Sequence, residues 1–352
     1  MRELSYSQAI NAALGQCLDA DPSVYVIGLG VPGPTGIFGT TSGLAERFGA
    51  HRVMDMPSSE AGMTGVALGT TIAGFRPIMV HMRVDFAILA MDQMVNQVAK
   101  WHFMYGGNLR APMVFRMIIG RGWGQGPQHS QSLHAWFSHI PGFKVAMPAT
   151  PHDVKGMLIS AVRDDAPVAI FEHRWLYGIK GDVPEESYEV PLGSARIVRE
   201  GRDVTIAATS YMVLEAIRAA EVLKAAGVEA EVVDVRSLVP LDLSRIAGSV
   251  EKCGAVVVAD TGALAYGASA EILAGIVEKA GGALRYPPKR IGLPFSPSPT
   301  SPSLADAFYP RAYDIVSAVA AMLDLDTSRI PPEPPSPERW RDKPDASFTG
   351  PY

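Results

Sequence analysis

Apolar residues follow two alternating patterns along the first half of the chain. Short unbroken apolar runs, typical of strands buried on both faces of a parallel sheet, are followed by segments whose apolar positions return every three or four residues, as on one face of a helix. The predicted strands are residues 24–27, 52–56, 78–82, 112–119, 144–147 and 167–171. This alternation predicts a doubly wound α/β domain built on a parallel sheet.

Helices are predicted between these strands from capping residues and helical spacing. They are a segment from Ser5 or Ser7 to Leu18, residues 44–48, a segment that starts near Glu60, residues 85–100, and a segment that starts near Pro151. The helix at 85–100 is expected to be long. Its predicted buried side consists of Phe86, Leu89, Met94 and Val98.

A second α/β pattern follows a polar and irregular stretch at residues 177–192. Its predicted strands are residues 204–208, 229–234, 255–259 and 289–292, and its predicted helices start after a Ser210 cap, at 268–279 and at 313–323. The last residues are rich in proline, which predicts an extended or disordered tail. We therefore expect a first domain at 1–185, a linker at 186–194, a second domain at 195–326 and a tail at 327–352.

Composition narrows the class of protein. Apolar residues make up 47% of the 352 residues and charged residues 19%, which is apolar for a lone soluble chain and predicts contacts between subunits. A net charge of −5 gives no basic field for nucleic acid, and no apolar run is long enough to predict a membrane span. Cys17 and Cys253 lie far apart, which disfavours a disulfide framework and favours a reducing cytoplasm.

Glu60 stands among mostly small or apolar residues, at the point where a predicted strand gives way to a predicted helix. It can be a surface glutamate in the first turn of the helix, where the helix dipole favours a negative charge. It can also be a buried glutamate that stays protonated and donates a hydrogen bond. The residues alone leave both interpretations open.

Two glycine-rich loops leave predicted strands at their carboxyl ends, where parallel sheets form ligand crevices. The second loop carries His129, which is either a solvated loop histidine or a ligand-facing one. His134 and His139 have no carboxylate or cysteine at metal-ligand spacing, so we expect packing roles and no metal site. The chain has no Walker loop, nucleophile elbow or dinucleotide fingerprint.

Four long segments resemble a known family. They are RVMDMPSSEAGMTGVALGTTIAGFRPI, DFAILAMDQMVNQVAKWHFMYGG, QHSQSLHAWFSHIPGFKVAMPATPHDVKGML and APVAIFEHRWLYG. Together they resemble the β subunits of thiamine-diphosphate-dependent 2-oxo acid dehydrogenases of the pyruvate, branched-chain and acetoin type. The segments VDVRSLVPLD, YGASAEI and LPFSPSP resemble the C-terminal domain of transketolases. The resemblance implies a transketolase-like pyrimidine-binding domain at 1–185 and a transketolase C-terminal-like domain at 195–326.

The resemblance also implies how the cofactor is bound. Glu60 matches the glutamate that hydrogen-bonds the aminopyrimidine ring of thiamine diphosphate, and His129 matches a histidine beside the thiazolium that serves proton transfer. The implied cofactor-binding set is Glu60, Leu29, Met82 and Phe86.

The family binds the diphosphate and magnesium through a Gly-Asp-Gly segment and a later asparagine pair. Here Gly181-Asp182 is followed by a valine, and no such pair comes after it. The resemblance therefore implies an α-type partner chain that holds the diphosphate and magnesium. It also implies a heterotetramer of two α and two β chains with a shared active site.

Some positions depart from the family pattern. The family often has acidic residues at Leu29 and Gly30, a glutamate near Val80 and a His-Glu pair at Asp260 and Thr261. Arg83 stands where the family more often has a small or apolar residue. One hypothesis is that Arg83, with His129, contacts an anionic 2-oxo substrate.

The predicted function is thus the β subunit of an enzyme that decarboxylates a 2-oxo acid and transfers the acyl unit to a lipoyl group, carried by an acyltransferase, or to a similar acceptor. Two alternatives remain. One is a split transketolase-like carboligase without a lipoyl acceptor, and the other is a non-catalytic assembly subunit. Retention of Glu60 and His129 argues against the second.

Overall fold

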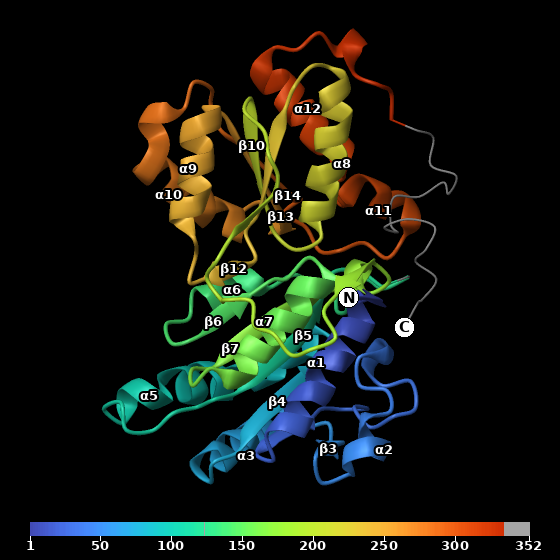
Figure 1. The fold of residues 1–352 in the computed structure, drawn as a ribbon, viewed down its shortest axis with the longest axis vertical. Helices are drawn as coiled ribbons and strands as arrows, with labels where there is room; N and C mark the ends of the chain where they lie inside the picture. The colour runs from blue at the N-terminus through green and yellow to red at the C-terminus, as the bar shows by residue number, and fades with distance from the viewer. Residues whose placement is uncertain (123, 334–352) are drawn as a thin grey trace. The chain divides into compact units, whose positions relative to one another are not determined.

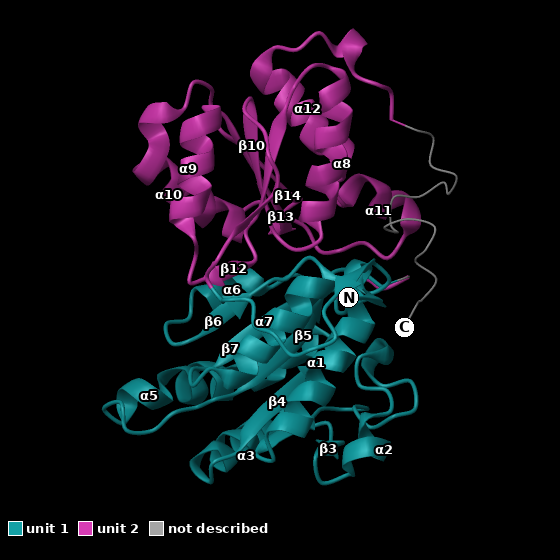
Figure 2. Ribbon diagram, viewed as in Figure 1, with its two compact units in different colours: residues 1–122, 128–192, 352 teal, residues 123–127, 193–351 magenta. Residues whose placement is uncertain are grey.

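The computed structural model describes residues 1–122 and 124–333 (Figure 1). Within them the chain divides into two compact units (Figure 2). Unit 1 comprises residues 1–122 and 128–192, and unit 2 comprises residues 124–127 and 193–333. Each unit has its own sheet and its own buried core.

Unit 1 is built on a parallel sheet. Its strands lie in the order β6 (Lys144–Ala146), β7 (Val168–His173), β5 (Val114–Ile119), β4 (Arg76–His81), β2 (Val24–Ile27) and β3 (Val53–Met54). All neighbouring pairs in this series are parallel, so the carboxyl ends of the strands lie along one edge. The central strands are buried on both faces and mostly apolar, as the apolar runs predict, with Arg116 in β5 and Glu172 in β7 as charged exceptions. The predicted α/β fold class is confirmed.

The helices of unit 1 are α1 (Tyr6–Ala20), α2 (Leu44–Phe48), α3 (Glu60–Ile72), α4 (Val84–Ala87), α5 (Trp101–Met104), α6 (His134–Ser138) and α7 (Pro151–Arg163). Five of them, α1, α2, α3, α4 and α7, start within one residue of the predicted positions, and the sequence did not predict separate starts for α5 and α6. Ser5 caps α1 in a reciprocal capping box with Gln8. Thr150 caps α7, whose first residue is Pro151. Helices α1 and α7 pack side by side (Figure 1).

The stretch predicted as a long helix at 85–100 is helical throughout, but it is not a regular α-helix. After α4 the backbone passes through a 3₁₀ turn (Ile88–Ala90), a π-helical turn (Gln93–Gln97) and a second 3₁₀ turn (Val98–Lys100) before α5. Met94 and Val98 are buried as predicted, whereas Leu89 is 64% exposed. Apolar spacing cannot separate these helix types, because a periodicity of three to five residues fits each of them.

The polar stretch at 177–192 is more regular than the sequence predicts. Residues Lys180–Val183 form strand β8, which pairs antiparallel with β1 (Arg2–Ser5). The residues that follow lie on α7, because the buried Lys155 ammonium donates to the carbonyls of Pro184, Glu185 and Glu186 at 2.6, 3.3 and 2.9 Å. These backbone groups are therefore held by a side chain of unit 1.

Unit 2 is a smaller α/β unit. Its sheet has the order β14 (Lys289–Leu293), β13 (Val256–Ala263), β10 (Val204–Ala208), β11 (Ala230–Asp234) and β9 (Arg196–Arg199), with β9 antiparallel to β11. The strand β12 (Ser237–Val239) follows β11. The helices are α8 (Met212–Ala225), α9 (Leu243–Cys253), α10 (Ala268–Ala280), α11 (Pro302–Phe308) and α12 (Ala312–Leu323). Figure 1 shows α8 beside α12 and α9 beside α10.

Ser210 does not cap α8, which corrects the prediction from its sequence position. Its backbone has a positive φ of 48°, and Tyr211 is the residue that precedes the helix, without a side-chain cap. The start of α8 is instead held by Glu215. Its carboxylate accepts from the Tyr211 hydroxyl at 2.5 Å and from the Ala312 amide at 2.8 Å, which joins α8 to α12.

The proline-rich tail predicted at 327–352 lies mostly outside the described residues. Its described part contains the 3₁₀ turn Thr327–Arg329. Among the described helices, none is both long enough and apolar enough to span a membrane.

Candidate active site

The predicted site residues of unit 1 come from segments at the carboxyl edge of its sheet. Helix α3 starts at Glu60 after β3, and β4 ends at His81, just before Met82 and Arg83. Strand β5 ends one residue before Gly120, which opens the segment that carries His129. This edge is where a parallel α/β sheet binds its ligands.

Glu60 is the first residue of α3 and is only 8% exposed. Within the described residues its carboxylate has no hydrogen-bond or ion-pair partner. Thr64, one turn further along the helix, is fully buried, and its hydroxyl also has no partner there. Buried polar groups normally have partners, because the loss of hydration is otherwise not offset. A carboxyl group without a partner in the protein is free to bond a ligand that offers a polar ring nitrogen.

His129 is exposed and packs edge-on against Phe86, with the ring centroids 5.3 Å apart. Two residues later, the Gln131 side-chain amide donates to Asp85 at 2.7 Å. Burial raises the pKa of Asp85, and the bond from Gln131 works against that effect. The structure thus joins the His129 segment to α4.

Leu29 and Met82 belong to neighbouring segments. A Cβ atom added at Gly30, next to Leu29, would lie 3.3 Å from the Met82 methyl carbon. The Gly30 amide donates to the Asp55 carboxylate at 2.8 Å, which ties the first glycine-rich loop to the segment before Glu60. Leu29 itself is 37% exposed, so its side chain remains available to a ligand or a partner.

Arg83 is 2% exposed and donates to the Gly120 carbonyl at 2.6 Å. Its guanidinium also faces the ring of Phe38 at 5.8 Å, and Arg174 faces the same ring at 4.5 Å. Phe38 has a positive φ of 52°, an unusual conformation for a bulky residue. The two arginines therefore hold a conformationally restricted residue of the first glycine-rich loop.

Sequence reasoning missed His81 and the Asp85–Gln131 pair. His81 is 2% exposed, its Nε2 atom has no partner among the residues that the structure describes, and burial lowers its pKa to about 4. It is therefore a neutral imidazole at neutral pH. The available signal was a histidine at the end of an otherwise apolar strand. Asp85 and Gln131 gave no signal, because they are far apart in the sequence.

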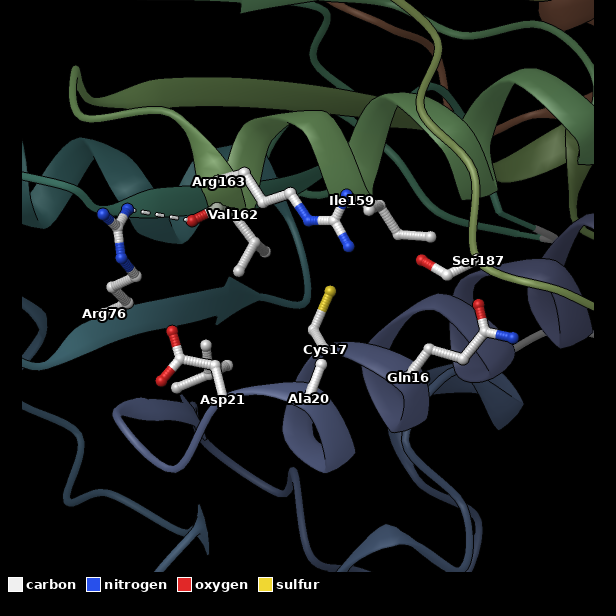
Figure 3. A pocket seen from close by; sticks show the side chains of 10 residues that line it. Gln16, Cys17, Ala20, Asp21, Arg76, Ile159, Val162, Arg163 and Ser187 are labelled. Atoms are coloured by element: carbon white, nitrogen blue, oxygen red, sulfur yellow. Dashed lines mark hydrogen bonds between the residues drawn. The ribbon is translucent and has the colours of Figure 1, made fainter.

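A separate cavity of about 310 Å³ lies between α1 and α7 (Figure 3). It is lined at the amino ends of β2 and β4 by Val24 and Arg76, so it lies at the edge opposite to Glu60. Burial raises the pKa of Cys17 in this cavity to about 12. The thiol is therefore protonated and unsuited to nucleophilic catalysis.

The described residues contain no group of three or more histidine, cysteine or acidic side chains placed to hold a metal ion. His134 is fully buried and packs against Phe171, with ring centroids 6.1 Å apart. Both cysteines are free and buried.

Comparison with known families and solved structures identifies both units. Residues 2–180 match the transketolase pyrimidine-binding domain, and residues 193–315 match the transketolase C-terminal domain. A split-gene transketolase, solved as an inactive β4 tetramer, superposes with a TM-score of 0.73 at 24% identity, over 92% of this chain and 99% of that one. The fold is therefore that of a transketolase-type two-domain α/β protein.

Sequence relatives narrow this class. The chain is 41% identical to the β subunit of acetoin:2,6-dichlorophenolindophenol oxidoreductase of Cupriavidus necator, over 90% of this chain and 96% of that protein. It is 40% identical to the same subunit of Bacillus subtilis, over 92% and 98% of the two chains. It is 39% identical to the mitochondrial pyruvate dehydrogenase E1 component subunit beta-2 of Oryza sativa subsp. japonica, over 90% and 85%. The chain belongs to the family of β subunits of thiamine-diphosphate-dependent 2-oxo acid dehydrogenases.

Proposed function

We propose that this chain is the β subunit of a thiamine-diphosphate-dependent oxidoreductase that decarboxylates a 2-oxo acid and transfers the acyl unit to an acceptor. The observation that carries the proposal is the buried Glu60 carboxyl group, which lies at the ligand edge of the sheet and has no partner within the described residues. The named relatives are dehydrogenase and oxidoreductase subunits, so the carboligase and assembly-subunit alternatives are not pursued.

Glu60 would hold the aminopyrimidine half of the cofactor through a ring nitrogen. A carboxyl group that carries its proton can donate this hydrogen bond. Leu29, Met82 and Phe86 would provide apolar contacts to the same half. When bound, thiamine diphosphate supplies the carbon nucleophile that attacks the 2-oxo acid and accepts the electrons released with carbon dioxide.

His129 would transfer protons at the substrate side of the site. Imidazole suits this task because it both donates and accepts protons near neutral pH. The His129 ring stands nearly perpendicular to the ring of Phe86, which limits its direction. Arg83 would contact an anionic group of the substrate, while one of its nitrogens stays committed to the Gly120 carbonyl.

An α-type partner would hold the diphosphate and magnesium, and two copies of each chain would form the heterotetramer. Support comes from the relatives, which are named as β subunits, and from exposed apolar side chains on unit 1. Val66 and Ile72 on α3 are 57% and 58% exposed. These side chains lie on the helix that Glu60 starts, so a partner chain there would cover exposed apolar surface.

The proposal also covers the domain bounds, the location of the protein and the acyl acceptor. We place the pyrimidine-binding domain at 1–185, a linker at 186–194 and the transketolase C-terminal-like domain at 195–326. We propose a cytoplasmic location and a lipoyl group, carried by an acyltransferase, as the acyl acceptor. The two buried free cysteines are compatible with a reducing compartment.

The test is to co-express the chain with a candidate α-type subunit from the same source and to purify the complex. Thiamine diphosphate binding is measured by quenching of tryptophan fluorescence in the presence of magnesium. A panel of 2-oxo acids is then screened for carbon dioxide release with 2,6-dichlorophenolindophenol as electron acceptor. We expect saturable binding and turnover of at least one substrate. A complex that forms but does not bind the cofactor would overturn the proposal.

A further inference from the structure

Two short segments of unit 1 are joined by a closed ring of hydrogen bonds. Arg83 donates to the Gly120 carbonyl at 2.6 Å, and the Gly120 amide donates to the Gln131 carbonyl at 3.3 Å. The Gln131 side-chain amide then donates to Asp85 at 2.7 Å. Arg83 and Asp85 are two positions apart in the chain, so the backbone between them closes the ring.

The bond between Gly120 and Gln131 brings together the two ends of the segment that carries His129. Gly120 has a positive φ of 75°, and a Cβ atom there would lie 2.3 Å from Nε2 of His173. No other residue fits this position without rearrangement. One end of the segment is therefore fixed by backbone geometry, and the other depends on the side-chain bond from Gln131 to Asp85.

Two consecutive residues of α4 hold two residues of this segment. Asp85 accepts from Gln131, and Phe86 presents its ring to His129. His129 makes no hydrogen bond within the described residues, so its direction depends on the Phe86 edge and on the backbone that Gln131 anchors. The second oxygen of Asp85 is buried and has no hydrogen-bond partner among the described residues. The bond from Gln131 therefore offsets only part of the cost of burying this carboxylate.

We propose that Asp85 is a positioning residue that sets the orientation of the His129 imidazole through Gln131. The inference rests on the role proposed above for His129. Asp85 contacts neither substrate nor cofactor in this account. It acts by holding the backbone two residues after the imidazole.

The first experiment observes His129 without any cofactor. The full chain is labelled at the histidine Cε1 carbon, and the His129 signal is assigned with His129→Gln. In the wild type we expect a ring-current shift from Phe86. Asp85→Ala should move this signal toward the value of a free histidine. Asp85→Asn should leave it in place, because the asparagine oxygen still accepts from Gln131.

A reversed pair makes this experiment sharper. In Gln131→Glu the new carboxylate meets Asp85, and the His129 signal should move. In the double variant Asp85→Asn with Gln131→Glu, the asparagine amide donates to the glutamate, and the signal should return. Asp92→Ala is the matched control, because Asp92 accepts from Asn96 in an exposed pair of the same kind, also 2.7 Å long.

The second experiment uses the complex with the α-type partner. Loss of one hydrogen bond of this kind predicts that Asp85→Ala lowers kcat roughly tenfold, with the cofactor Kd unchanged within about twofold. In a His129→Ala background, Asp85→Ala should have no further effect on kcat, because it acts through His129.

An unmoved His129 signal in Asp85→Ala would overturn the inference. So would an equal loss of kcat in both backgrounds. If the complex shows no cofactor-dependent turnover at all, the proposed function fails. The cofactor-free experiment still decides whether Asp85 orients His129.

Discussion

Arg116 and Glu172 form a two-pronged ion pair between the central strands β5 and β7, with donor–acceptor distances of 2.6 and 2.8 Å. The side chains are 1% and 0% exposed, and the Tyr177 hydroxyl donates to the same carboxylate at 2.6 Å. The positive charge of Arg116 and this hydroxyl therefore compensate the buried negative charge. The pair lies in the sheet whose carboxyl edge carries the candidate site.

We predict that Glu172→Gln lowers the free energy of unfolding by about 3 to 5 kcal/mol, because it leaves the Arg116 charge buried without a counter-ion. A double replacement, Arg116→Met with Glu172→Met, should be much less harmful, because it removes both charges. Urea denaturation followed by tryptophan fluorescence measures both values. A loss of less than about 1 kcal/mol in Glu172→Gln would show that the charge is compensated elsewhere.

The Lys155 ammonium fixes the segment that leads out of unit 1. Lys155→Met should lower the free energy of unfolding by about 2 kcal/mol, because it removes the donor to three consecutive carbonyl groups. The segment at 184–190 should also become a site of early proteolytic cleavage. Lys180→Met is the control, since Lys180 is exposed and makes only a 3.5 Å surface pair with Glu3. Equal cleavage rates in the two variants would contradict this account.

The lowered pKa of His81 should make the free energy of unfolding depend on pH. Burial lowers its pKa in the folded chain from the ordinary value of 6.5 to about 4. The unfolded chain therefore binds the proton more tightly, and the stabilising contribution is present above pH 6.5 and is lost as pH falls toward 4. The full loss amounts to roughly 3 kcal/mol.

His81→Leu should remove this contribution. The measurement is the free energy of unfolding at pH 7 and pH 5 for both proteins. We expect a smaller difference between the two pH values in the variant than in the wild type. The same difference in both proteins would show that other groups cause the acid sensitivity.

Two possible roles of Arg83, contact with an anionic substrate group and support of the Gly120 carbonyl, can be told apart by comparing substrates. If it contacts an anionic group, Arg83→Ala should raise KM more for a 2-oxo acid with a second carboxylate than for one with an apolar side chain. If it only holds the Gly120 carbonyl, both substrates should be affected alike. Arg83→Lys keeps the charge and is the control. An unchanged KM and kcat for every substrate in Arg83→Ala would rule out the substrate contact.

The comparison of sequence and structure shows which features local patterns determine. The strand Val24–Ile27 and the helix Leu44–Phe48 have the predicted bounds, because an apolar run or a short helical repeat is a local property. The pairing of β1 with β8 was missed, since both strands are short and largely polar, and they lie far apart in the chain. The turn at Ser210 was misassigned because a serine before a helical pattern usually caps it.

In the candidate site, too, local features could be predicted from the sequence and long-range contacts could not. Glu60 was found because a glutamate among small and apolar residues is locally unusual, but only the fold shows that it is buried without a partner. Asp85 and Gln131 meet although they lie 46 positions apart in the chain, with strand β5 between them. No spacing rule relates such positions, so their contact required the three-dimensional structure.

Glu60→Gln in the complex with the α-type partner is the most direct test of the central claim. Glutamine keeps the size of the side chain, so the complex should assemble normally. It cannot supply the carboxyl proton, so only the chemical role of Glu60 is lost. We predict that cofactor-dependent turnover of the best 2-oxo acid falls by about 10² or more. Turnover within about twofold of the wild type, at saturating thiamine diphosphate and magnesium, would contradict the account.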